Sequence, residues 1–261
     1  MSGIVLSISS QVAFGPVGNS ATAPALESLG FTVLQIPTTI LSFHPGHGKP
    51  AGLRTTGREI AAICNALLDK GMLSACAGIF TGYFATPEQV AAAADIIRTL
   101  KKMRPAPCYF CDPVIGDDPA GLYAPIEVAE AINKQLLPLA DCIAPNRFEL
   151  FWLAGEHVRN QQEAEAAARS LGVPEVLATS IPSGEDLATL VIQKESSHAC
   201  VSAKLKDVPH GTGDLLSGLY LGHRLLGSTP AVALDSAMDR LGKVIVASAG
   251  SNALDLAKGF Q

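Results

Sequence analysis

The sequence has few charged residues and no long apolar run. Only 16% of its 261 residues are Asp, Glu, Lys or Arg, against roughly 25% in an average soluble domain. The formal net charge is −5, which argues against a nucleic-acid-binding protein, because such proteins carry a basic face. No uninterrupted apolar stretch reaches the roughly 18 residues that indicate a membrane span. The hydrophobic share of 48% instead predicts a chain that buries a large core.

A secretory signal and a disulfide framework are also not indicated. No Lys or Arg precedes the first apolar stretch, Ile4–Leu6, as a secretory signal requires, so we expect a cytoplasmic protein. Cys108 and Cys111 have the C-x-x-C spacing of redox or zinc sites. In a strand, however, residues three apart face opposite sides of the sheet, and no second C-x-x-C completes a zinc site. The six cysteines are therefore predicted to be reduced core residues.

Short apolar runs alternate with longer segments of helical spacing along the whole chain. The predicted strands are Gly3–Ile8, Phe31–Ile36, Ala75–Thr81, Pro107–Cys111, Asp141–Ala144, Val176–Ala178, Ala188–Gln193 and His198–Ser202. The predicted helices are Asn19–Leu29, Thr55–Lys70, Thr86–Met103, Pro125–Gln135, Asn146–Ala154, Gln161–Leu171, Thr212–Leu226 and Ala231–Ser251. This order predicts an α/β fold of three layers, a mainly parallel central sheet with helices on both faces. Without a linker or repeat, residues 1–261 are expected to form one domain.

The strongest chemical pattern is the segment His210–Gly218, which opens an apolar helix. Gly211 and Gly213 leave backbone N–H groups uncovered at a helix N-terminus, and this arrangement suits phosphate. A carboxylate in such a turn repels phosphate, but Asp214 fits as a general base that takes a proton from an attacking hydroxyl. The structural alternative is a capped helix with an ordinary Asp in its first turn.

Polar residues also follow three of the predicted strands, where ligands of such sheets bind. Asp112 and Asp117 lie in turns after the strand that ends at Cys111 and suit Mg²⁺ or a water-bridged metal phosphate, although turn formation alone explains them equally well. Asn146 can cap the next helix, while Glu149 either closes a capping box or faces the metal. A further strand ends at Thr179 and Ser180, whose hydroxyls are available to phosphate.

Taken in this order, the motifs resemble the ribokinase-like superfamily and, within it, the pyridoxal kinases of vitamin B6 salvage. The resemblance spans most of the chain and rests on the ordered set rather than on one motif. The set comprises the Ser-x-Val-x-aromatic-Gly-x-x-Gly-Asn-Ser pattern of Ser10–Ser20, Phe43-His44, Gly82-Tyr83, Cys111–Val114, Ala144–Asn146 and Gly211–Asp214.

The resemblance implies ATP-dependent phosphorylation of the 5′-hydroxymethyl group of pyridoxal, and of pyridoxine and pyridoxamine. ATP and Mg²⁺ are the implied cofactors, and a monovalent cation such as K⁺ is left open. The resemblance also implies a homodimer, which the low share of charged residues permits. No nucleic acid or membrane is expected as a partner.

The resemblance further implies roles for individual residues. On the vitamer side, Ser10 and Tyr83 would touch the pyridine ring, near Val17, Phe43, His44 and Pro45. Metal and phosphates would be organised by Asp112, Asp117, Asn146 and Glu149, with Asp112 and Glu149 as the metal ligands. Tyr123, Thr179 and Ser180 would line the nucleotide side. The anion hole would be Gly211, Thr212 and Gly213, with Asp214 as the base.

The sequence departs from the family pattern in two places. Pro45 stands where similar kinases usually carry Thr, and the stretch between Ser180 and His210 is short, which predicts a trimmed nucleotide lid. The irregular, loop-bound spacing of His44, His47 and His210 argues against a transition-metal site.

Two other functions stay open at this point. A hydroxymethylpyrimidine kinase shares the fold and the base, but it is expected to have a different Gly-rich motif in place of Ser10–Ser20. A degenerate, non-catalytic binder of pyridoxal phosphate or ATP is favoured by Pro45 and the short lid. The intact Asp214 argues against that second alternative.

Overall fold

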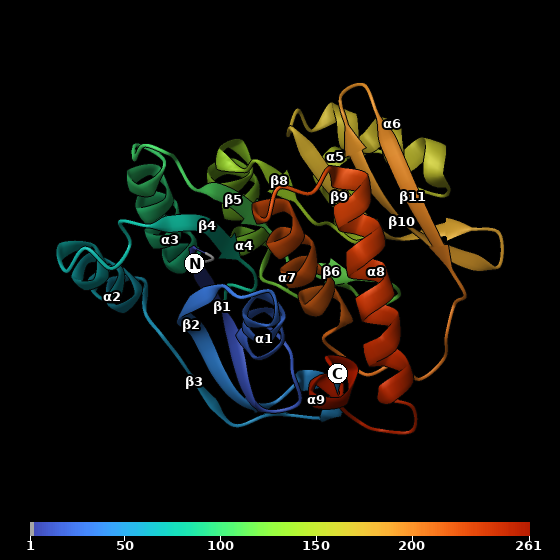
Figure 1. Cartoon of the computed structure of the whole chain (residues 1–261), viewed down its shortest axis with the longest axis horizontal. Coiled ribbons are helices and arrows are strands. Elements are labelled where there is room, and N and C mark those ends of the chain that lie inside the picture. Colours follow the sequence, from blue (N-terminus) through green and yellow to red (C-terminus); the bar gives the residue numbers. More distant parts are fainter. Residues whose placement is uncertain (1–2) are drawn as a thin grey trace.

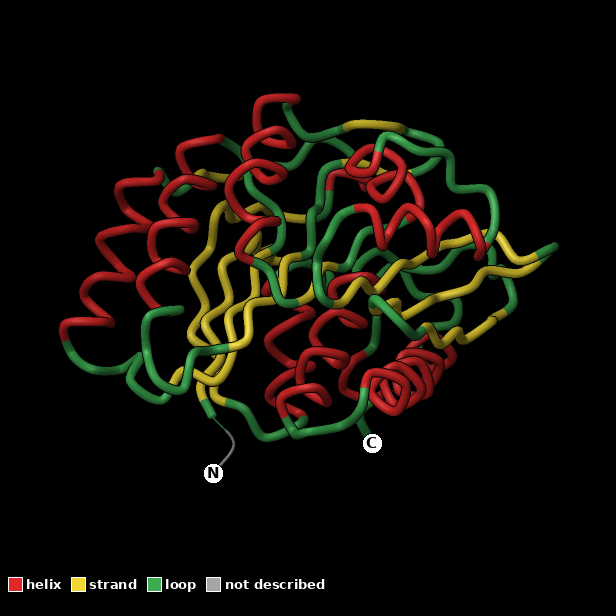
Figure 2. The backbone as a smooth tube through the Cα atoms, turned by 90° about the horizontal axis from the view of Figure 1, so that it is seen from above, coloured by secondary structure: helices red, strands yellow, loops and turns green. Residues whose placement is uncertain are grey.

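One sheet runs through the computed structural model, which describes residues 3–261 (Figures 1 and 2). Its strands are β1 (Ile4–Phe14), β2 (Thr32–Phe43), β3 (Gly52–Arg54), β4 (Cys76–Thr81), β5 (Cys108–Cys111), β8 (Cys142–Ile143), β9 (Glu175–Ser183), β10 (Asp186–Gln193) and β11 (Ser197–Ser202). They lie in the order β11-β10-β9-β8-β5-β4-β1-β2-β3. The six central strands, from β9 to β2, pair in parallel, whereas β3, β10 and β11 pair antiparallel.

Helices cover both faces of this sheet, so the predicted three-layer α/β architecture is confirmed. They are α1 (Asn19–Ser28), α2 (Gly57–Asp69), α3 (Pro87–Leu100), α4 (Ile126–Ala131), α5 (Arg147–Ala154), α6 (Gln161–Ser170), α7 (Thr212–Leu225), α8 (Pro230–Ala247) and α9 (Leu256–Gly259). One apolar cluster joins α2–α6 to the sheet, and a second joins α1 and α7–α9 to it. Tyr109 and Phe110 of β5 contribute to opposite clusters, because successive side chains of a strand point to opposite faces.

Local capping explains where several helices begin. Thr56 with Glu59, Thr86 with Gln89 and Asn146 with Glu149 each form a complete capping box, which satisfies two backbone donors at the helix start. The predicted start at Thr86 is thereby confirmed.

The first two strands are longer than the sequence indicates. The predicted ends were Ile8 and Ile36, but β1 continues to Phe14 and β2 to Phe43. The polar residues 9–11 look like a strand end, yet the pairing resumes after a register shift between Ser9 and Gln11, opposite Pro37. Proline has no N–H to donate to the ladder, so the irregularity falls where Pro37 lies.

Several other boundaries differ from the prediction, three of them by about four residues or more. The strand predicted at Val176–Ala178 extends over all of β9, because it pairs with β10 in a hairpin. The helix predicted at Pro125–Gln135 is α4, followed by the π turn η2 (Ile132–Leu136) and the 3₁₀ turn η3 (Leu137–Leu139). The helix predicted to end at Ser251 ends at Ala247. Neither β3 nor the small hairpin of β6 (Gly116–Asp117) and β7 (Gly121–Leu122) was predicted.

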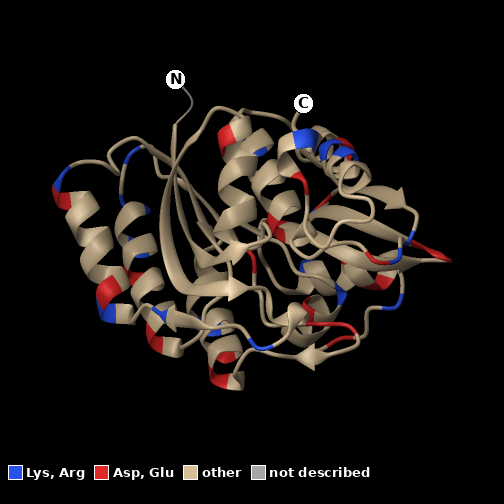
Figure 3. Cartoon of the chain, turned by 90° about the horizontal axis from the view of Figure 1, so that it is seen from below, with Lys and Arg blue, Asp and Glu red and all other residues tan. Residues whose placement is uncertain are grey.

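Charged residues lie mainly on the outer helices and loops, with both signs interspersed (Figure 3). Among the described residues, no helix has the length and apolar character needed to cross a membrane. The predicted single-domain organisation of residues 1–261 stays a prediction.

Candidate active site

Two acids meet where the carboxyl end of β5 approaches the N-terminus of α7. Asp112 directly follows β5, and its backbone N–H donates to Thr81 O at the end of β4, at 2.8 Å. Asp214 lies in the first turn of α7. One turn further along α7, Ser217 Oγ donates to Asp112 Oδ2 at 2.9 Å. The sheet and α7 therefore hold together two acids from distant parts of the chain.

Both acids bind protons more readily than usual. Burial raises the pKa of Asp112 to about 8, with the charge of Asp214 acting in the same direction and the Ser217 hydrogen bond opposing it. Burial likewise raises the pKa of Asp214 to about 6, opposed by a hydrogen bond from the Gly18 backbone. In the described part of the chain, neither carboxylate forms an ion pair with Lys or Arg. A carboxyl group that titrates near neutral pH suits general-base chemistry.

The N-terminus of α7 is open to an anion. Gly211 precedes the helix, and no side chain caps it, so the N–H groups of the first turn have no side-chain acceptor. A Cβ placed on Gly213 would meet no atom within 4 Å, which means that the turn borders open space. Uncovered donors and the positive end of the helix dipole favour a phosphate group here.

The loop after β1 packs directly on this turn. Gly211 has φ +101°, and a Cβ there would lie 2.0 Å from Pro16 O. Gly18, with φ +57°, leaves no room for a Cβ beside Ser10 O, at 2.3 Å. Thr22 Oγ1 of α1 donates to Asp214 O at 3.2 Å. Only glycine permits such close backbone contact at these two positions. The contact of Gly211 with Pro16 thus connects the loop after β1, called the front loop below, to the turn that carries Asp214.

Glu149 is buried and held by backbone donors. Its Oε1 accepts from the N–H groups of Ile115 at 2.9 Å and Gly116 at 3.4 Å, and its Oε2 accepts from that of Asn146 at 2.9 Å. Asn146 caps α5 and donates through Nδ2 to Gly116 O at 2.8 Å. Burial, followed by the charge of Asp112, raises the pKa of Glu149 well above its usual value against these donors. The capping roles foreseen for Asn146 and Glu149 are confirmed, and Glu149 also lies near Asp112.

Asp112, Asp214 and Glu149 together form the acid cluster of the site, and Asp117 and Tyr123 lie at its rim. Tyr123 is half-exposed, and its pKa is raised by partial burial and by the charges of Glu149, Asp112, Asp117 and Asp214. Partial burial also raises the pKa of Asp117. The structure therefore gathers these five predicted residues in one neighbourhood.

The residues predicted for the vitamer side lie around the ends of β1, β2 and β4. Val17 is buried and lies against Gly211, while Ser10 lies against Gly18. Thr38 Oγ1 of β2 donates to Tyr83 O at 2.7 Å, and burial raises the pKa of the Tyr83 phenol. Phe43 is half-buried at the end of β2.

Three histidines from two loops lie close together: His44 and His47 follow β2, and His210 precedes α7. The rings of His44 and His210 have centroids 4.0 Å apart, and those of His47 and His210 are 5.6 Å apart at 85°. Burial and the two neighbouring histidines lower the pKa of His44 to about 4. His44 Nδ1 accepts from Gly46 N, at the start of the 3₁₀ turn η1 (Pro45–His47). These contacts join the loop after β2 to the residue before the Gly211 turn.

Thr179 and Ser180 lie within β9 rather than at its end. Thr179 bridges to Asn146 beyond β8, and its N–H donates to Pro145 O at 3.0 Å. Ser180 is exposed and has φ +59°, a strained conformation that is common at functional sites. Within the described part of the chain, neither side chain forms a hydrogen bond with the acids near Asp112.

No role in the site was predicted for Ser217 or His210, although both lie in the segment His210–Gly218. A signal existed for Ser217, because it lies three residues after Asp214 and therefore on the same helix face. The His210 contact had no such signal, since it depends on how the loop after β2 folds back.

Comparison with known proteins agrees with this geometry. Residues 58–259 match a family model described as phosphomethylpyrimidine kinase. The pyridoxal kinase PdxY of Granulibacter bethesdensis is 31% identical over 97% of this chain and 92% of its own length. The pyridoxal kinase PdxY of Deinococcus radiodurans is 33% identical over 91% and 84%, respectively.

A solved structure gives the same result for the fold. The pyridoxal kinase of Leishmania donovani in complex with ADP and pyridoxamine matches with a TM-score of 0.90 and 30% identity, over 98% of this chain and 94% of that one. Since sequence and fold agree over nearly the whole length, the chain belongs to the pyridoxal kinase family of ribokinase-like enzymes.

Proposed function

We propose that this chain transfers the terminal phosphoryl group of ATP to the 5′-hydroxymethyl group of pyridoxal, and of pyridoxine and pyridoxamine. The observation that carries this proposal is Asp214, a carboxyl group with a pKa of about 6 in the first turn of an uncapped helix. A base beside uncovered N–H donors can accept a hydroxyl proton while the donors stabilise the phosphoryl group that receives the oxygen.

Each part of the site has a separate task in this reaction. The Asp214 carboxylate accepts the proton of the attacking 5′-hydroxyl. The hydroxyl oxygen then bonds to the terminal phosphorus of ATP, while the bond between this phosphorus and the ADP oxygen breaks. The N–H groups of Gly211, Thr212 and Gly213 bind the phosphoryl oxygens. The contact of Gly211 with Pro16 O supports a front loop that keeps vitamer and phosphate in register.

The acid cluster fits a magnesium ion. Asp112 and Glu149 offer hard carboxylate oxygens, the ligands that Mg²⁺ prefers. Burial raises the pKa of both groups, and neither has a basic partner within residues 3–261, so a bound cation would favour their ionised forms. Bound there with ATP, Mg²⁺ would neutralise phosphate charge. Asp117, Asn146 and Tyr123 would assist on the phosphate side, and Thr179 and Ser180 would line the nucleotide.

The vitamer is proposed to bind at the ends of β1, β2 and β4. Ser10 and Tyr83 would contact the pyridine ring, and Val17, Phe43, His44 and Pro45 would surround it. The half-buried aromatic and apolar groups here support a neutral, flat substrate.

The test is an assay of ADP release with pyridoxal, ATP and Mg²⁺, run in parallel with hydroxymethylpyrimidine as the acceptor. We expect turnover with pyridoxal and a much smaller kcat/KM with the pyrimidine. A preference for the pyrimidine would overturn the proposed substrate. Binding of pyridoxal by calorimetry without ADP release would overturn the proposed catalysis.

A homodimer, which the family resemblance implies, and a cytoplasmic location are also proposed. The end of the sheet that contains β1, β2 and β3 carries exposed apolar residues, namely Phe14, Ile40 and Leu53. A second subunit could cover them. Light scattering at micromolar concentration tests the dimer, and a mass near 27.1 kDa would contradict it. Cell fractionation tests the location.

A further inference from the structure

A second group of potential metal ligands lies away from the acid cluster, between β11 and α8. His198 and Cys200 are two residues apart on β11, the last strand of the sheet, and therefore point to the same face. Asp235 lies in the second turn of α8, which runs alongside this strand (Figure 1). Cys200 packs against the apolar cluster beneath α7 and α8, so the shared face of His198 and Cys200 is the one that α8 covers.

The three side chains converge on one carboxylate oxygen. His198 Nε2 lies 2.7 Å from Asp235 Oδ1, and Cys200 Sγ lies 3.1 Å from the same atom. The ligand atoms of all three residues lie within 4.8 Å of one another. Bonds of roughly 2.0–2.3 Å in a tetrahedral zinc site place ligand atoms about 3.3–3.8 Å apart. A small outward rotation of the Asp235 side chain, which is 57% exposed, therefore makes room for an ion.

The ligand set itself selects among metals. Imidazole nitrogen, cysteine sulfur and a carboxylate oxygen are the three ligand types of zinc, whereas Mg²⁺ and Ca²⁺ prefer oxygen alone. Three protein ligands leave the fourth tetrahedral position to water. The partial exposure of the site gives the ion a route from solvent.

Without an ion, the same atoms form a hydrogen-bonded cluster. The Cys200 thiol donates to Asp235 Oδ1 and therefore carries its proton. Binding of a divalent ion then replaces this proton: a sulfur–metal bond forms, and one proton leaves to solvent.

We propose that His198, Cys200 and Asp235 form a zinc-type divalent metal site that joins the edge strand β11 to α8. The ion crosslinks two elements that are adjacent in space but separated in sequence by the Gly211 turn and α7. An ion that binds only the folded state stabilises that state.

Cobalt(II) is the probe that separates this site from the acid cluster. The chelator-treated protein is titrated with Co²⁺, and a thiolate-to-cobalt charge-transfer band in the near ultraviolet reports sulfur coordination. We expect one sulfur-bound Co²⁺ per chain, displaced by Zn²⁺. Oxygen ligands such as Asp112 and Glu149 do not produce this band.

Substitutions at the three ligands test which residues produce the charge-transfer band. Cys200→Ser is expected to abolish it, and Asp235→Asn or His198→Ala to weaken Co²⁺ binding by more than about tenfold. Cys108→Ser, at the other half-buried cysteine, and Asp239→Asn, one turn further along α8, are the matched controls and should bind as the unmodified chain does. Pyridoxal kinase assays of Cys200→Ser check that it folds.

A second measurement covers the case in which a variant folds poorly. Zn²⁺ at about 100 times its Kd should raise the melting temperature of the unmodified chain by roughly 5–10 °C, and that of Asp235→Asn by much less. The proposal is overturned by the absence of a sulfur band in the unmodified chain, by its survival in Cys200→Ser, or by an equal thermal shift in Asp235→Asn.

Discussion

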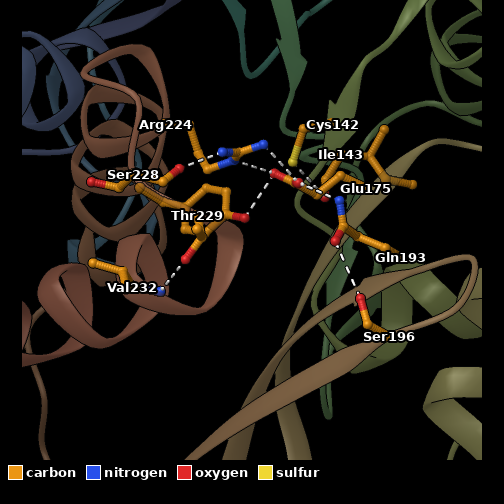
Figure 4. A network of polar contacts seen from close by, with 10 residues as sticks. Cys142, Ile143, Glu175, Gln193, Ser196, Arg224, Ser228, Thr229 and Val232 are labelled. Atoms are coloured by element: carbon orange, nitrogen blue, oxygen red, sulfur yellow. Dashed lines mark hydrogen bonds and ion pairs between the residues drawn. The ribbon is translucent and has the colours of Figure 1, made fainter.

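The two ends of α7 hold buried carboxylates in opposite ways. At its C-terminal half, Arg224 donates from Nε to Glu175 Oε1 at 2.9 Å and from Nη2 to Oε2 at 3.1 Å, and Tyr220 Oη donates to Oε1 at 2.7 Å. Gln193 adds a bond to Oε2 at 3.2 Å (Figure 4). At its first turn, Asp214 and the nearby Asp112 have no cationic partner in the described chain.

The comparison separates a structural acid from reactive ones. Glu175 has its charge matched by a guanidinium group and its oxygens filled by donors, so nothing remains for a ligand. Burial raises the pKa of both Asp112 and Asp214, and the charge of Asp214 raises that of Asp112 further. Buried carboxylates without partners destabilise a fold, and such costs are typical of functional sites. In the proposed reaction, Mg²⁺ would supply the missing positive charge.

The largest effect should follow removal of that positive charge. In excess chelator, the turnover of pyridoxal should fall to background, because ATP phosphates without Mg²⁺ meet the uncompensated acids Asp112 and Glu149. ADP release measured with EDTA and after re-addition of Mg²⁺ checks this. Full turnover in excess chelator would contradict the proposed metal role.

Next in size is the loss of the base. Asp214→Asn keeps the shape of the first turn of α7 but cannot accept a proton, so kcat should fall by about two to four decades with little change in KM. Ser217→Ala, which leaves Asp214 intact and removes only the bond to Asp112, serves as the comparison and should lose much less. An Asp214→Asn rate within a factor of about three of the unmodified chain removes Asp214 from catalysis.

The paired acid should respond in stability instead of rate. Glu175→Gln leaves Arg224 without its counter-charge, and we expect a loss of about 3 kcal/mol in the free energy of unfolding with kcat nearly unchanged. Glu163→Gln, which breaks the exposed pair with Arg159, should cost much less, because exposed ion pairs contribute little to stability. Denaturant unfolding of both variants measures these free energies. Equal losses in the free energy of unfolding would mean that the buried pair is no stronger than a surface pair.

The unpaired acid should respond with the opposite sign. Asp112 has a folded pKa of about 8 against an ordinary 3.8, so the folded state binds the extra proton between these values. The stability from that proton is complete below pH 4 and is lost as pH rises through 8.

Asp112→Asn removes this loss, and at pH 8 we expect it to raise the unfolding free energy by about 0.5–2 kcal/mol while activity falls. Melting curves from pH 5 to pH 8 should show a gain that grows with pH. Titration of His44, with its pKa lowered to about 4, lowers stability as pH falls below 6.5 in both proteins and cancels in the difference. A gain that is constant with pH would contradict the raised pKa.

The features that sequence predicted are those encoded locally. The Gly-x-Gly-Asp turn and the acid after Cys111 each specify a strand-end or helix-start geometry, and the repeated β–α order brings such ends to one edge of the sheet. The Asn146–Glu149 box is likewise local. The features that were not predicted depend on partners distant in sequence. They are the bond from Ser217 to Asp112, the contact between the His210 and His44 rings, and the continuation of β1 through polar residues.

The smallest effect concerns the loop after β2, which is proposed to contact the vitamer. Pro45 is exposed at the first position of η1 and keeps His44 extended, with φ −64° and ψ 138°, as a residue before proline requires. His44 is thereby held against His210, at 4.0 Å between ring centroids. A threonine at this position would add a hydroxyl that can bind the substrate, and one neutral hydrogen bond contributes about 0.5–1.5 kcal/mol.

Pro45→Thr should therefore lower KM for pyridoxal about two- to tenfold and leave KM for ATP unchanged, because the nucleotide is proposed to bind elsewhere, at Thr179 and Ser180. Pro50→Thr, in the same loop but outside η1, is the control and should change neither constant. Steady-state kinetics with each substrate varied in turn measure both. If KM for pyridoxal stays the same or rises, the histidines held by Pro45 contribute as much to vitamer binding as the threonine hydroxyl would, and the loop then recognises the ring by packing instead of by that hydrogen bond.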